Sequence, residues 1–163
     1  MSYKSILIDQ MTACYNDKSW FLPLKEILAG LTAEQAAAEN ECKQSIWKIV
    51  NHLHFWNEKW LERFKLGVIE LTHLDNEETF YLNPHGMNDS EWRETLIKLE
   101  AVYESWIKEL QDCEDSKLMI TIPTYFNAPW WGVVSNLCTH NAYHIGQIML
   151  LKKQMLDKTT SIK

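Results

Sequence analysis

Glycine and proline are scarce in this chain, with 5 and 4 occurrences among 163 residues. No segment is of low complexity, so collagen, a mucin stalk and a mainly disordered chain are all excluded. The length lies in the usual range of one domain, about 100 to 200 residues. We therefore expect residues 1–163 to form a single domain.

Positive charge is in deficit as well. The chain has 16 lysines and arginines against 22 aspartates and glutamates, which gives a net charge of -6. Proteins that hold nucleic acid neutralise its phosphates with basic side chains. We therefore expect the partner to be a small-molecule substrate and not a nucleic acid.

Long hydrophobic runs are missing too. Asp9 and Gln10 interrupt the N-terminal stretch where a signal peptide would need continuous apolar residues. No later run approaches the roughly 18 apolar residues of a membrane span. The sequence predicts a cytoplasmic protein without a membrane partner.

The cysteines form no C-x-x-C pair, which argues against a zinc ribbon, a redox motif and a dense disulfide framework. We interpret them as reduced thiols: Cys14, Cys42, Cys113 and Cys138. The chain also lacks a serine nucleophile elbow, a Walker loop, a dinucleotide-binding glycine pattern and an H-E-x-x-H motif.

Apolar residues recur every three or four positions through most of the chain, which predicts long amphipathic helices. We place them at about Ser5 to Gly30, 45–67, 89–112 and 129–155. Within the first, Pro23 predicts either a kink or a break near Ser19, with the proline in the first turn of the restarted helix. The expected fold is all-α, a four-helix bundle with long connecting loops.

Several helix ends carry recognisable signals. Thr32 and Gln35 have the spacing of a capping box, which predicts a short alanine-rich helix through Glu39. Ser45 is the expected cap of the second long helix, and Gly67 suits the left-handed position after it.

The connections between the later helices are longer. Residues 68–88 lack helical periodicity and form a loop long enough to act as a lid. Asn88 and Glu91 are spaced as a capping box for the third long helix. Residues 119–127 have a composition typical of strands, but Pro123 limits them to an edge strand or an extended loop.

His140 and His144 form the strongest local pattern, because a spacing of four on a helix stacks two side chains on one face. That face is also apolar, since Val133, Leu137, Ile148, Leu151 and Met155 lie within about 80° of the pair. One interpretation is a pair of buried neutral histidines hydrogen-bonded to the protein or to water. The other is a shared metal ion, which satisfies both imidazoles at once.

A third ligand is expected from another helix. His52 and His54 lie at opposite margins of the apolar face of the second long helix, so periodicity does not choose between them. His73 and His85 fall in the long loop, where we expect them to be solvated.

The segments LAGLTAEQAA, SIWKIVNHL and APWWGVVSNLCTHNAYHIGQI resemble the DinB-like superfamily of four-helix bundles, which is unrelated to the DNA polymerase of that name. The spacing of these segments matches that of the superfamily over most of the length of the chain. It implies a metal site formed by His52, His140 and His144, with His54 as a packing residue or a neighbour of the ligands. Many members have arginine just before the Gly-Gln pair, where this chain has Ile145, which implies a different substrate.

Three imidazoles leave at least one coordination position for water or substrate, as in catalytic metal sites. The ion could lower the pKa of bound water for hydrolysis, or hold a thiol as its thiolate. Relatives include thiol-dependent transferases and proteins described as hydrolases. The resemblance therefore implies a bacillithiol-type S-transferase that uses a divalent metal, zinc or nickel, together with a low-molecular-weight thiol and small electrophiles.

Four other side chains lie close to these histidines in the sequence. Gln147 could orient a ligand or bond a neighbouring helix, and Tyr143 could reach the site mouth or pack at the bundle edge. Asn57 lies on an apolar face, which predicts a structural role with hydrogen-bond partners. Cys138 lies about 160° from His140 on the helix and is excluded as a ligand.

A non-catalytic alternative stays open, namely a metal sensor or a ligand-binding dimer. Such a protein would be expected to close its coordination sphere with a fourth protein ligand, for which the loop offers His73, His85, Glu77 and Glu78. The resemblance and the many aromatic residues favour a homodimer in either case.

Overall fold

The computed structural model describes residues 2–69 and 75–160, with side chains to residue 156. The helices and strands are α1 (Tyr3–Tyr15), α2 (Leu24–Leu28), α3 (Ala33–Ala37), α4 (Ile46–Leu66), the 3-10 helix η1 (Asn76–Phe80), α5 (Asp89–Asp112), α6 (Asp115–Met119), β1 (Thr121–Ile122), β2 (Ala128–Pro129) and α7 (Trp130–Thr160).

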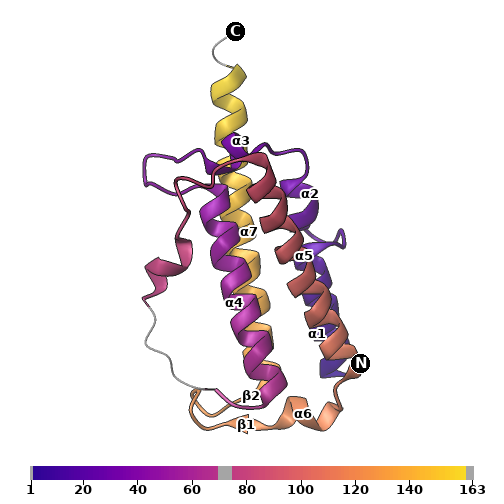
Figure 1. Ribbon diagram of the computed structural model, residues 1–163. Coiled ribbons are helices and arrows are strands. Elements are labelled where there is room, and N and C mark those ends of the chain that lie inside the picture. The colour runs from indigo at the N-terminus through magenta and orange to yellow at the C-terminus, as the bar shows by residue number, and fades with distance from the viewer. Residues whose placement is uncertain (1, 70–74, 161–163) are drawn as a thin grey trace.

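Four of these helices form the bundle. Helices α1, α4, α5 and α7 run alongside one another, and α7 extends beyond the others at its C-terminal end (Figure 1). Each packs against two of the others, because contacts join α4 with α5, α5 with α1, α1 with α7, and α7 with α4. The predicted all-α four-helix bundle is confirmed.

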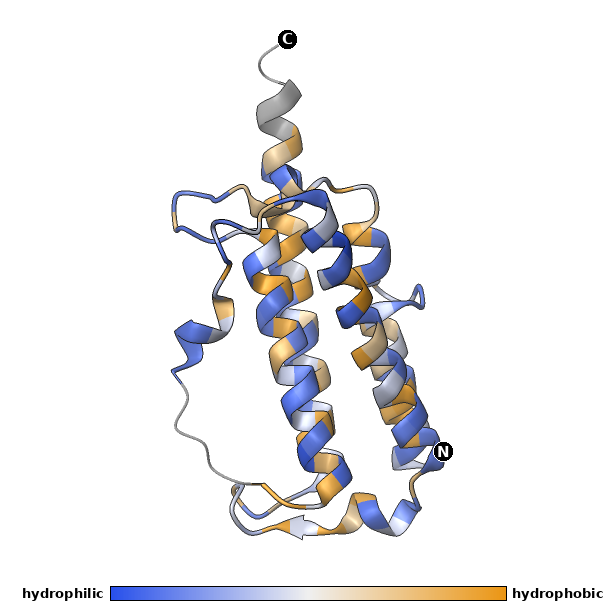
Figure 2. Ribbon diagram, viewed as in Figure 1, coloured by the Kyte–Doolittle hydropathy of each residue, from blue (hydrophilic) through white to orange (hydrophobic). Residues whose placement is uncertain are grey.

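Large aromatic side chains fill the core between these helices. Hydrophobic and hydrophilic residues alternate around each long helix, as expected when one face is buried (Figure 2). The largest fully buried side chains are Trp92, Trp106, Trp130, Tyr103, Phe64 and Met11. Trp20, in contrast, is fully exposed in the link between α1 and α2.

The first predicted helix is two separate helices. Helix α1 ends at Tyr15, earlier than the break expected near Ser19, and the chain returns to helix only at Leu24. Pro23 is the cap that precedes α2 and not a residue of its first turn. Its fixed φ of -68° and extended ψ explain why a continuous helix to Gly30 does not form.

The predicted caps of the next helices are present. Thr32 and Gln35 form a reciprocal capping box on α3, and Ser45 accepts a hydrogen bond from a backbone N–H of α4. Gly67 ends α4 at a φ of 72°, where a side chain would be strained. Asn88 caps α5 by accepting hydrogen bonds from the backbone N–H groups of Ser90 and Glu91, but among the described residues the Glu91 side chain does not return the bond that would complete the predicted capping box.

The links after α4 contain more structure than the sequence indicates. Residues 76–80, predicted to be loop, form η1, and α6 was not anticipated at all. Both have five residues, too few for an apolar period to register. Strands β1 and β2 pair antiparallel, so the strand-like segment contributes a two-residue edge strand.

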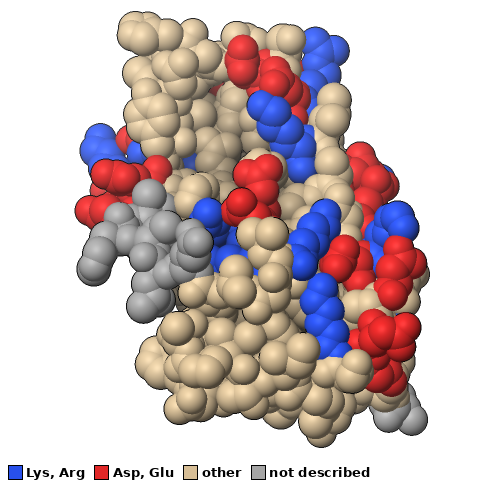
Figure 3. All heavy atoms as spheres, turned by 60° about the horizontal axis from the view of Figure 1, so that its bottom comes forward, with Lys and Arg blue, Asp and Glu red and all other residues tan. Residues whose placement is uncertain are grey.

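Charges are interspersed over the surface. On the face in Figure 3, lysine and arginine side chains alternate with aspartate and glutamate side chains, without a broad region of one sign. Within the described part of the chain, no helix combines the length and hydropathy that crossing a membrane requires. Helix α7 continues to Thr160, past the predicted end at Met155.

Candidate metal centre

Three histidines from two helices meet at the interface of α4 and α7. His52 lies on α4, and His140 and His144 lie one turn apart on α7. One nitrogen of each ring lies within 4.8 Å of the others, and the Nε2 atoms of His52 and His140 are 3.0 Å apart. His52 and His144 are 2% and 6% exposed, and His140 is half-buried.

These separations suit a shared metal ion. Imidazole nitrogens lie about 2.0 to 2.1 Å from zinc, so two ligands of one tetrahedral ion are about 3.4 Å apart. The 3.0 Å between His52 and His140 therefore needs only a small adjustment to admit an ion. Among the described residues, the group contains these three side chains and no fourth.

Thr79 of η1 fixes the proton position on His52. The Thr79 hydroxyl donates to the carbonyl oxygen of Asn76 at 2.6 Å, so its oxygen accepts from Nδ1–H of His52, also at 2.6 Å. Nε2 of His52 then carries a lone pair, and it faces the other two rings. Hydrogen bonds of this kind orient metal-binding histidines in known sites.

Gln147 does the same for His144. Its amide nitrogen donates to the hydroxyl of Tyr143 at 2.9 Å, and its amide oxygen accepts from Nδ1–H of His144 at 2.7 Å. The lone pair of His144 is thereby left on Nε2. Gln147 thus bonds a histidine on its own helix, and Tyr143 lines the pocket with 64% of its surface exposed.

The third ring, His140, completes a donor set that fits a divalent metal. Its Nδ1 is buried without a hydrogen-bond partner, while its Nε2 faces His52. Two rings are thus held with their Nε2 lone pairs turned inward, and the third lies against His52. Three neutral imidazoles are a common ligand set for zinc, nickel, copper or iron.

Burial keeps these imidazoles uncharged. Burial, together with repulsion from the neighbouring histidines, lowers the pKa of His52 to about 3 and that of His140 to about 4. Burial also lowers the pKa of His144. The neutral form is the one that ligates metal, so the cluster is ready to bind at neutral pH.

The same shifts predict an acid-sensitive fold in the metal-free protein. Since the folded-state pKa values lie below the unfolded value of about 6.5, the unfolded chain takes up protons first as the pH falls. The free energy of unfolding should decline from pH 6.5 towards pH 4, by about 1 kcal/mol for each of His52 and His140 at pH 5.5. Urea unfolding with chelator at pH 7.5 and 5.5 measures this, and a His52→Gln variant should show a smaller decline.

An aromatic ring and an open pocket flank the cluster. Phe80 stacks on His52 with ring centroids 3.9 Å apart and planes 10° from parallel. The adjoining pocket has a volume of about 570 Å³ and is lined by all three histidines, by η1, by α7 and by the link between α3 and α4. A small molecule can therefore reach the inward-facing nitrogens.

Several other candidates lie away from the cluster. His54 is half-buried and lines a separate hollow between α4 and α5 together with Glu58 and Lys98, and it is not part of the histidine group. Cys138 is buried in the core, consistent with its exclusion.

The loop candidates for a fourth ligand do not join the cluster in the described chain. His85 and Glu78 are exposed and do not line the pocket. Glu77 lines the pocket but is not among the grouped ligand atoms. His73 lies outside the described residues.

A buried amide pair sets the position of α4 against α7 beside the cluster. Asn57 and Asn141 are fully buried and exchange two side-chain hydrogen bonds, of 2.8 and 3.0 Å. Asn141 is next in sequence to His140, and Asn57 lies five residues after His52. The structural role expected for Asn57 is therefore present, and its partner was not anticipated.

Comparison with known proteins agrees with this arrangement. The family model of the DinB superfamily matches residues 24–148, which is most of the chain. The chain belongs to the DinB superfamily. Among curated proteins, no sequence matches it significantly.

A solved structure supports the same fold. YfiT from Bacillus subtilis, described as "a probable metal-dependent hydrolase with an unusual four-helix bundle topology", superposes with a TM-score of 0.68. The two chains are 17% identical, and the match covers 94% of this chain and 85% of YfiT. At this identity the likeness establishes the fold.

Ile145 occupies the position where the family resemblance leads us to expect arginine. Its side chain is 2% exposed and packs in the core of this DinB-superfamily chain. It is absent from the lining of the pocket. The pocket therefore gains no cation from this position.

Thr79 is the contact that sequence reasoning missed, and it can be tested by replacement. In Thr79→Val the Nδ1–H of His52 loses its acceptor, so the ring is free to rotate or change tautomer. We expect zinc affinity, measured by competition with a chromogenic chelator, to fall about tenfold to a hundredfold. Thr121→Val, an exposed threonine of β1, is the matched control and should leave the affinity unchanged.

Proposed function

We propose that this protein is a metal-dependent enzyme in which His52, His140 and His144 hold one divalent transition ion, zinc or nickel. The reaction we favour is transfer of a low-molecular-weight thiol to a small electrophile. The observation that supports it best is a cluster of three uncharged imidazoles that opens onto a pocket of about 570 Å³. Homodimer assembly and a cytoplasmic location belong to the same proposal.

The protein's own residues bind the metal ion and orient its ligands. Thr79 and Gln147 hold two imidazoles with their lone pairs inward, and Phe80 covers one face of His52. A bound divalent ion supplies Lewis acidity, which lowers the pKa of a coordinated thiol or water. The pocket holds the second reactant beside that position.

An open coordination position favours an enzyme over a sensor. Structural and sensory sites usually close their coordination with a fourth protein ligand. In the described residues no fourth histidine, cysteine, aspartate or glutamate joins the cluster. The cluster therefore fits an open metal site, with space for a reactant, better than a closed one.

The thiol reaction is tested by following the loss of free thiol. Zinc- or nickel-loaded protein is mixed with a low-molecular-weight thiol and an alkyl halide, an epoxide or an activated aromatic electrophile. We expect thiol consumption that stops on chelation and is absent in His144→Ala. Consumption that is equal with and without metal would count against the transferase.

Hydrolysis is the second candidate, because YfiT is described as a probable metal-dependent hydrolase. The same pocket could present water in place of a thiol. Incubation of loaded protein with ester and amide substrates, without any thiol, separates the two reactions. Product formed without thiol and lost in His144→Ala would favour the hydrolase.

A further inference from the structure

The lining of the pocket has an unusual balance of polar groups. Neutral amides dominate beside the histidines: Asn40, Gln44, Asn76, Gln147 and Gln154. Glu77 is the one charged side chain among the described lining residues, and neither lysine nor arginine lines the pocket. A site that binds carboxylates or phosphates usually offers them a cation.

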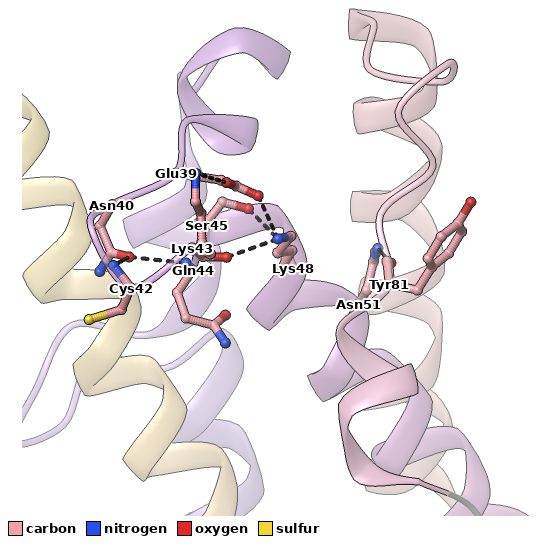
Figure 4. Close-up of polar contacts among 9 residues, drawn as sticks. All are labelled: Glu39, Asn40, Cys42, Lys43, Gln44, Ser45, Lys48, Asn51 and Tyr81. Carbon is pink, nitrogen blue, oxygen red and sulfur yellow. Dashed lines mark hydrogen bonds and ion pairs between the residues drawn. The ribbon is translucent and has the colours of Figure 1, made fainter.

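The carboxylate of Glu77 is available for a ligand. Its backbone N–H is held by the side chain of Asp75, which caps η1, while within the described chain its carboxylate makes no hydrogen bond or ion pair. Asn51 of α4 donates to the carbonyl oxygen of Tyr81 at 2.8 Å, which anchors the end of the segment (Figure 4). Glu77 therefore projects from a backbone that is fixed at both ends.

The link between α3 and α4 adds no lysine or arginine to the described lining of the pocket. Asn40 accepts from the backbone N–H groups of Cys42 and Gln44, which shapes the link before α4 (Figure 4). Lys43 and Lys48 lie on this link and at the start of α4, but both pair with Glu39. Glu39 offsets one of these two positive charges, and neither lysine side chain lines the pocket.

We propose that this pocket selects small molecules whose group away from the reacting atom is cationic, such as an ammonium group, and disfavours carboxylates. Glu77 is the residue that makes the selection, and the amides hydrogen-bond the remaining polar groups. The inference rests on the proposed function in taking this pocket as the substrate site. Applied to thiol transfer, the favoured cofactor is an aminothiol.

The charge of the pocket can be measured without any metal through Cys42. This thiol lines the pocket and is exposed, whereas Cys14, Cys113 and Cys138 are buried. We compare the rates at which two methanethiosulfonates modify Cys42, one carrying a cationic trimethylammonio-ethyl group and the other an anionic sulfonato-ethyl group. Both reactions contain chelator and have an ionic strength of about 10 mM, at which the Debye length is about 30 Å.

Removal of the Glu77 charge should shift this rate ratio. At about 10 Å, one charge changes the ratio of cationic to anionic reagent about threefold to fourfold in water. We expect Glu77→Gln to lower the ratio by that factor and Glu104→Gln, an exposed residue of α5, to leave it unchanged. Equal ratios in Glu77→Gln and the parent protein would overturn the inference.

Binding of matched thiols tests the selection at the metal. Cobalt-loaded protein is titrated with 2-aminoethanethiol, 2-mercaptoethanol and mercaptoacetate, which differ in the charge of one end, and cobalt–thiolate absorbance reports binding. We expect the aminothiol to bind about fivefold more tightly than mercaptoacetate, and Glu77→Gln to remove the difference. Equal or tighter binding of mercaptoacetate would overturn the inference.

The two experiments separate this inference from the proposed function. If no thiol binds but Glu77→Gln shifts the Cys42 ratio, the transferase fails and the charge selection stands. If thiols bind and react but neither the ratio nor the preference depends on Glu77, the transferase stands and the selection fails.

Discussion

Replacement of His144 by alanine is expected to abolish stoichiometric metal binding. Protein purified without a histidine tag or a metal column should contain about one equivalent of a transition metal by elemental analysis, and His144→Ala almost none. The two remaining imidazoles, 3.0 Å apart, would bind a metal ion far more weakly than three, because each ligand adds to the affinity. Other metal ligands in the cell would then compete the ion away. Enzyme activity should be lost with the metal.

His54→Ala provides the matched control. This histidine is on the same helix as His52, two residues away, but faces a separate hollow beside Glu58 and Lys98. Its replacement should leave the metal content near one equivalent. Metal absent from the parent, or retained in His144→Ala with unchanged helicity by circular dichroism, would return these residues to the role of buried neutral histidines.

Replacement of Asn57 by leucine is expected to lower the free energy of unfolding by about 3 kcal/mol. In a fully buried position, the Asn141 amide oxygen would lose its bond from Asn57 and the amide nitrogen would keep only its weak contact with the Met11 sulfur. Each unpaired buried polar group costs about 1 to 3 kcal/mol. Chemical denaturation monitored by circular dichroism measures the change. Asn136→Leu, on the exposed part of α7, should alter stability by less than about 0.5 kcal/mol.

A double-mutant cycle identifies the amide pair as the cause. If the reciprocal hydrogen bonds account for the loss, Asn57→Leu and Asn141→Leu should be strongly non-additive, because the second replacement removes the groups left unpaired by the first. Additive losses would show instead that each asparagine acts through other contacts. Zinc affinity should also fall in both single variants, since the pair holds α4 against α7 beside His140.

Local signals in the chain predicted several helix caps correctly. Thr32, Ser45 and Asn88 cap helices as expected, because a side-chain oxygen three residues before a free backbone N–H needs only local geometry. Gly67 ends α4 for a similar reason. The bundle itself follows from apolar periods long enough to define one face of each helix.

The same local signals did not predict the two shortest helices of the later links. Helix α6 and η1 span five residues each, and their conformations depend on what they pack against. The buried Thr79 and the stacked Phe80 make η1 part of the site wall, although Thr79 lies 27 positions after His52 in the sequence. No sequence spacing reports a contact across such a loop.

The sequence by itself determined the pairing of His140 with His144, because four residues on one helix bring two side chains together whatever surrounds them. Tertiary structure decided the rest of the site. Both His52 and His54 were compatible with the period of α4, and only the packing of α4 on α7 turns the first towards the pair and the second towards α5. Contacts between helices depend on how their faces meet, and that is a property of the assembled bundle.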